Sequence, residues 1–129
     1  MTEFEWMEQF EKYSLPKNSF HHADHVKMAF LYLHKYPPLD ALARFSSALA
    51  RSAAAQGKPS LYNETITWGF LLLIRERIAR ASSPQTWAEF SACNPDLLCW
   101  DDNVLKKYYC PETLTSELAK RVFLFPDKL

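Results

Sequence analysis

The chain of 129 residues contains only two glycines, and none of its segments alternates apolar and polar residues. Such alternation marks half-buried strands, so a sheet has little support, and the abundance of alanine and leucine favours helices. An apolar fraction of 48%, with 15% aromatic residues, is sufficient for a hydrophobic core. The sequence therefore predicts an all-α fold, with a single helical domain over residues 1–129.

Prolines and capping residues divide the chain into about five to seven predicted helices. The core of the bundle is predicted from helices near residues 19–35, 38–56 and 61–81. Further helices are expected near residues 3–13, 87–92 and 112–122. Because the loops between the three core helices are short, these helices should pack up-down-up, which brings the N-termini of the first and third to the same end.

Local signals give the expected ends of these helices. Asn18 or Ser19 should cap the helix near 19–35, and Ser60 or Asn63 should cap the helix near 61–81. Gly57 is placed to end the helix between them, since glycine accepts the left-handed backbone conformation found after many helices.

Three of the four histidines, His21, His22 and His25, lie at the start of the helix near 19–35. At 100° per residue, His22 and His25 fall on the same side as Ala29 and Leu33, which is the apolar side. His21 falls at the border of that side, where it can turn inward or reach solvent. The pattern therefore predicts that two imidazoles face the core.

A carboxylate is expected to join these two imidazoles. Glu64 lies in the first turn of the helix near 61–81, at the edge of its apolar stripe. Up-down-up packing would bring it to the same end of the bundle as His22 and His25.

Two imidazoles and one carboxylate, with coordination positions left open, suit a divalent metal ion such as iron, manganese or zinc. The predicted metal ligands are His22, His25 and Glu64, with His21 as a further candidate. Thr67 and Tyr32 could orient these ligands or hold a bound cofactor or substrate.

These residues predict a small metal-binding protein, and a metal-dependent enzyme if the ion activates water or dioxygen beside a small molecule. One alternative is a metal-free module in which the same side chains form a buried hydrogen-bond network and bind an organic ligand. Another is an interaction protein whose apolar segment Phe123–Phe125 binds a partner or a second copy in a homodimer.

Composition argues against other classes of function. Fifteen basic and fifteen acidic residues cancel, which disfavours nucleic acid or an anionic membrane as partner. The acidic N-terminus is unlike a secretory signal, and no apolar stretch is long enough to span a membrane. The three cysteines match no zinc or redox motif and are expected to be reduced thiols. We therefore expect a cytoplasmic protein.

The segments Phe20–Val26 and Tyr62–Trp68, followed by Asn94–Leu98 and Tyr108–Tyr109, resemble the signature of a group of small bacterial all-helical proteins. These segments are spread over most of the chain. No activity is established for that group, so the resemblance implies a stand-alone bacterial protein and adds no catalytic residue.

Overall fold

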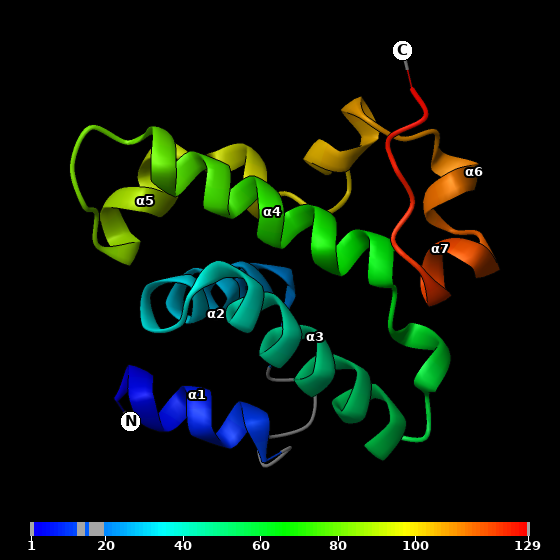
Figure 1. The fold of residues 1–129 in the computed structure, drawn as a ribbon, viewed down its shortest axis with the longest axis horizontal. Coiled ribbons are helices and arrows are strands. Elements are labelled where there is room, and N and C mark those ends of the chain that lie inside the picture. Colours follow the sequence, from blue (N-terminus) through cyan, green and yellow to red (C-terminus); the bar gives the residue numbers. More distant parts are fainter. Residues whose placement is uncertain (1, 13–14, 16–19, 129) are drawn as a thin grey trace.

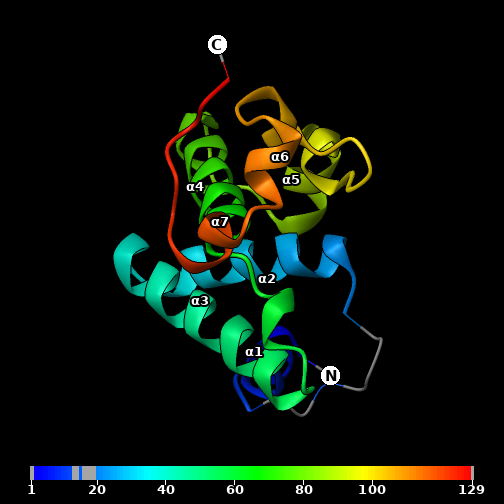
Figure 2. The same cartoon turned by 90° about the vertical axis from the view of Figure 1, so that its right-hand side faces the viewer.

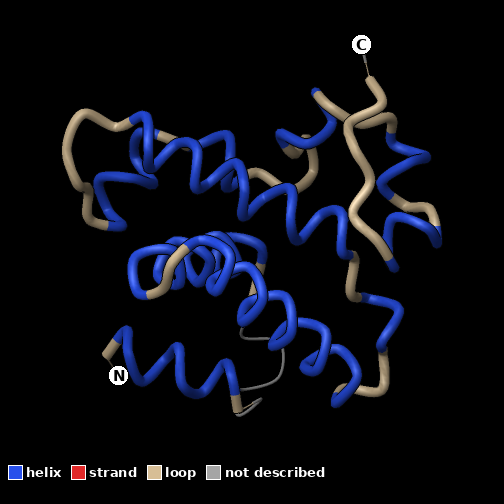
Figure 3. The backbone as a smooth tube through the Cα atoms, viewed as in Figure 1, coloured by secondary structure: helices blue, strands red, loops and turns tan. Residues whose placement is uncertain are grey.

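The computed structural model describes residues 2–12, 15 and 20–128. Within these residues the chain forms seven α-helices and three short 3₁₀-helices, and no strand (Figures 1 and 3). The α-helices are α1 (Glu3–Glu11), α2 (His22–Lys35), α3 (Pro38–Ala55), α4 (Glu64–Arg80), α5 (Trp87–Cys93), α6 (Pro111–Leu114) and α7 (Glu117–Arg121). The 3₁₀-helices are η1 (Pro59–Leu61), η2 (Pro95–Leu98) and η3 (Val104–Lys107). The predicted all-helical single domain is confirmed.

The helices are arranged in layers around α2 and α3. Helix α1 lies on one side of this pair, and α4 lies on the other side together with the elements that follow it (Figures 1 and 2). The core contains Phe10 of α1, which packs edge-on against Tyr32 of α2 and lies 5.7 Å, between ring centroids, from Phe45 of α3. One continuous core therefore joins the outer helix to the central pair.

Helices α2 and α4 cross each other. Helix α4 lies lengthwise in Figure 1, where α2 is foreshortened, and the reverse holds in Figure 2. The first residue of α2, His22, packs its ring edge-on against Phe70 in the middle of α4, with 4.8 Å between the ring centroids. The crossing thus brings the start of α2 to the middle of α4, away from the first turn of α4.

The segment of residues 122–128, here called the C-terminal strap, binds back onto the domain. Thr65 of α4 is fully buried; its hydroxyl donates to the Val122 carbonyl at 2.8 Å and accepts from the Leu124 backbone N–H at 3.1 Å. Tyr109 donates to the Leu124 carbonyl at 2.6 Å. Within the strap, Leu124 packs against the core, whereas Phe125 is exposed.

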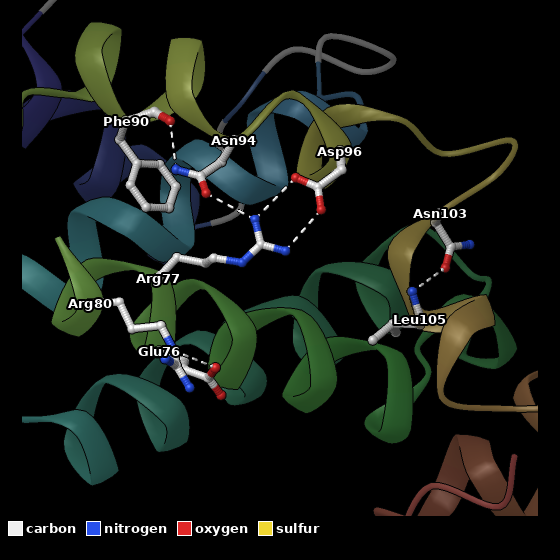
Figure 4. Close-up of polar contacts among 8 residues, drawn as sticks. All are labelled: Glu76, Arg77, Arg80, Phe90, Asn94, Asp96, Asn103 and Leu105. Atoms are coloured by element: carbon white, nitrogen blue, oxygen red, sulfur yellow. Dashed lines mark hydrogen bonds and ion pairs between the residues drawn. The ribbon is translucent and has the colours of Figure 1, made fainter. Parts of the chain in front are cut away.

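A polar network joins α4 to α5 and η2 (Figure 4). Arg77 makes two parallel hydrogen bonds to the Asp96 carboxylate, at 2.8 and 3.0 Å, and a third to the Asn94 side chain. Asn94 is buried and donates to the Phe90 carbonyl at 2.8 Å. A planar guanidinium matches a carboxylate in this paired geometry, so the network fixes η2 against α4. The position of η2 matters for the site, because Leu97 lies on it.

Several predicted helix ends are confirmed. Asn63 caps α4 by accepting from the Ile66 N–H, and α3 begins at Pro38. Gly57 follows the end of α3 with a φ of 73°, the left-handed conformation for which glycine was expected there.

Two predicted ends were wrong. Helix α2 begins at His22 with His21 as its cap, because the Asp24 carboxylate accepts from the His21 backbone N–H at 2.9 Å. The caps predicted for it, Asn18 and Ser19, lie outside the described residues. The helix predicted over 112–122 is divided into α6 and α7, because Ser116 has an extended backbone and its hydroxyl caps a new helix by accepting from the Ala119 N–H.

Candidate functional site

A cavity of about 670 Å³ lies between α2, α3 and α4, with η1 and the C-terminal helices at its edge. The inner wall is apolar and belongs to the core. Its side chains are at most 7% exposed; they include Val26, Ala29, Phe45, Phe70 and Ile74. The volume falls in the range that small-molecule sites occupy, roughly 300 to 1,000 Å³.

The other part of the lining reaches the surface and is here called the mouth. Leu61 of η1 is 66% exposed and Trp100 is 48% exposed. Exposed polar residues, among them Gln56, Ser60 and Thr115, also line the cavity. The cavity is therefore open to solvent at this mouth and closed by core side chains at its inner end.

His22 lines the cavity from the first turn of α2. Its Nε2–H donates to the Leu97 carbonyl at 2.9 Å, and its ring packs against Trp100 with 5.1 Å between centroids. Burial lowers the pKa of His22, and the hydrogen bond to Leu97 opposes this only in part. The ring is therefore neutral at physiological pH, with Nδ1 as a hydrogen-bond acceptor.

His25 lines the cavity one turn further along α2 and packs against Phe20, with 4.5 Å between ring centroids. Burial lowers its pKa to about 4, and the neighbouring His22 adds to this effect. Its ring has no hydrogen bond to another described side chain or backbone group. His25 therefore offers a neutral donor and acceptor to whatever occupies the cavity.

Tyr62, between η1 and α4, adds a hydroxyl to the lining. It donates a short hydrogen bond to the Glu64 carboxylate. Burial and this carboxylate raise the pKa of Tyr62, while the nearby hydroxyls of Ser46 and Thr67 oppose the rise. The Ser46 hydroxyl is buried and has no well-formed hydrogen bond within the described part of the chain. A small cluster of oxygens therefore lies at the start of α4.

The structure brings together some of the predicted site residues and separates others. His22, His25 and Thr67 line the same cavity, as their helical faces predicted. Glu64 does not line it and binds Tyr62 instead, because the first turn of α2 meets the middle of α4. Tyr32 is buried on the side that faces α1, where its hydroxyl donates to Glu11 at 2.6 Å.

Among the residues described, no three His, Cys, Asp or Glu side chains are grouped in a way that could hold a metal ion. His21 is exposed and caps α2. The metal site stays a prediction from the sequence. Sequence reasoning gave no role to Tyr62 or to Lys120 of α7, which also lines the cavity. No local motif marks either residue, since both reach the cavity only through the packing of distant segments.

Comparisons of the chain with models of known families, with curated proteins and with solved structures give no match. In the part of the chain that the structure describes, no helix combines the length and apolar character needed to cross a bilayer. The function must therefore be argued from the cavity itself.

Proposed function

We propose that the protein binds a small, largely apolar molecule in the cavity between α2, α3 and α4. The observation that carries the proposal is the cavity itself, with a volume of about 670 Å³ and an inner wall of core residues. The partly buried apolar side chains of the lining, such as Phe20, Leu49 and Ile66, leave apolar surface that a ligand would cover.

The polar residues of the lining support a ligand with one or two polar groups. His22 and His25 are neutral and can each accept a hydrogen bond, and Thr67 and Tyr62 carry hydroxyls. Such groups, placed among aromatic walls, orient a ligand without the large cost of burying a charge.

The proposal is tested by filling the cavity. Ala53 of α3 is 9% exposed and lines the cavity, so Ala53→Leu places a larger side chain in the ligand's space. We expect the uncharged fluorophore Nile red to bind the wild-type protein with a blue-shifted emission, and its affinity for Ala53→Leu to fall at least tenfold. A fluorescence titration measures both.

Ala54→Leu is the matched control. Ala54 is adjacent on the same helix but exposed and outside the cavity lining, and leucine and alanine have similar helix propensities. This variant should bind Nile red as the wild type does. Failure of Nile red to bind, or equal binding by Ala53→Leu, would count against a ligand site in this cavity.

A divalent metal ion held by His22 and His25 is the second candidate, because both imidazoles line one cavity. Iron, manganese or zinc would need its remaining ligands from the bound molecule or from water. Elemental analysis by plasma mass spectrometry should find near-stoichiometric metal in the wild type and none in a His22→Ala, His25→Ala variant that circular dichroism shows to be folded. Absence of metal after anaerobic reconstitution would reject this candidate.

A further inference from the structure

We propose that the ligand is an amphipathic carboxylate, with its hydrocarbon part in the inner cavity and its carboxylate at the mouth beside Lys120. This inference rests on the proposed function and adds the chemical class of the ligand. Its basis is the uneven distribution of polarity and charge along the cavity wall.

The apolar part of the lining suits a hydrocarbon. It includes partly buried side chains such as Phe20, Leu49 and Ile66, which retain surface that a ligand can cover. Covering apolar surface of this kind contributes roughly 25 cal/mol of favourable free energy per Å² removed from water. A purely polar ligand would forgo this contribution.

The mouth carries a positive charge. Among the described residues that line the cavity, Lys120 is the only lysine or arginine, and no aspartate or glutamate is among them. His22 and His25 add no charge, because burial keeps them neutral. The lining therefore favours an anion over a cation, and it favours the anion at one end only.

The ion pair that Lys120 makes in the structure is weak. Its Nζ lies 3.4 Å from the Glu117 carboxylate, and the Glu117 side chain is 82% exposed while that of Lys120 is 29% exposed. An ion pair with so exposed a carboxylate contributes little to stability. A ligand carboxylate at the cavity mouth would be less solvated than Glu117 and can take its place on the ammonium group.

The position of Lys120 also suits a ligand whose hydrocarbon chain lies in the cavity. Helix α7 packs beside α4, and Lys120 shares the rim of the cavity with Thr115, whereas core residues of the lining such as Val26, Phe45 and Ile74 lie on α2, α3 and α4. An amphipathic molecule can thus bury its chain between the three helices and keep its head at the surface.

The test compares dodecanoate with dodecanol, which has the same chain and an uncharged head, as competitors of bound Nile red. Three proteins are measured: wild type, Lys120→Gln, and the control Lys12→Gln. Lys12 is an exposed lysine of a comparable ion pair next to α1, away from the cavity. We expect dodecanoate to bind wild type and Lys12→Gln about tenfold more tightly than dodecanol does, and this preference to disappear in Lys120→Gln.

Three other outcomes are informative, the third with dodecylamine as an additional competitor. Equal affinity for dodecanoate and dodecanol in the wild type, unchanged in Lys120→Gln, would overturn the carboxylate and leave the binding cavity in place. Failure of both compounds and of Nile red to bind would overturn the proposed function, and with it this inference. A preference for dodecylamine over dodecanoate would also overturn the inference, because it requires a negative mouth.

Discussion

His25 shows how burial keeps an ionisable side chain neutral. Its ring packs against Phe20 at the cavity, and the pKa falls from 6.5 to about 4 because burial disfavours the imidazolium. The neighbouring Asp24 favours the charged form but does not outweigh burial. The pKa of His22 is also lowered, and burial is again the main cause.

The shift makes stability depend on pH. Above pH 6.5 the ring is neutral in both the folded and the unfolded chain, so it has no effect. Between pH 6.5 and about 4 only the unfolded chain binds the proton, so the free energy of unfolding should fall by at most about 3 kcal/mol as the pH falls. Below about pH 4 both states are protonated and the decline from this residue ends.

Urea denaturation at a series of pH values measures this effect. His25→Leu should flatten the decline between pH 6.5 and 4, leaving the smaller contribution of His22. His34→Gln, which removes an exposed imidazole away from the main cavity, controls for the loss of a histidine as such. An unchanged decline in His25→Leu would show that His25 is not buried in the neutral form.

The C-terminal strap supports helix α4 through a single hydroxyl. Thr65 is fully buried, and its side chain satisfies both the Val122 carbonyl and the Leu124 N–H. A buried backbone group that loses its partner costs about 1 to 3 kcal/mol. The strap in turn covers the side of α4 near Trp68, which stacks on Phe123 with 5.6 Å between ring centroids.

Thr65→Val keeps the shape of the side chain and removes the hydroxyl. We expect the free energy of unfolding to fall by about 2 kcal/mol, because two backbone groups of the strap lose their partner. Thr115→Val is the control, since that hydroxyl is exposed and its loss should cost less than about 0.5 kcal/mol. Urea denaturation compares the two; equal effects would mean that water replaces the Thr65 hydroxyl.

How far the elements could be read from the sequence depended on how local their signals are. Asn63, Pro38 and Gly57 act on their own backbone, and each was predicted correctly. The start of α2 was placed too early, because Asp24 caps it through a bond to the His21 N–H that competes with the cap expected upstream. The break between α6 and α7 likewise follows from a local hydrogen bond, in which the Ser116 hydroxyl caps α7.

In the candidate site, too, the residues with local signals could be predicted and the others could not. His22 and His25 face inward because the helical period fixes their side of α2, and Thr67 follows from the same rule on α4. Glu64 was expected beside them, but that required a crossing angle that hydrophobic periodicity does not specify. Lys120 reaches the cavity from the short helix α7, which packs on α4, so no pattern near it in the chain could have indicated it.

The domain should unfold in one step, since the core that joins α1 to α2 and α3 continues to α4 and beyond. The four tryptophans include Trp6 on α1, Trp68 on α4 and Trp87 on α5, so their fluorescence reports on separate helices. We expect urea transitions followed by fluorescence and by far-ultraviolet circular dichroism to coincide. Distinct midpoints would show that α1 or the C-terminal elements unfold independently.

The strap also bears on how the protein forms during synthesis. Thr65 cannot obtain its partners until residues 122–128 have left the ribosome, although α4 itself emerges much earlier. The nascent chain must therefore carry α4 with one side uncovered while the segment between α4 and the strap is translated. The packing of α4 is consequently complete only after the strap has emerged, and the uncovered side of α4 is where a chaperone would act on the growing chain.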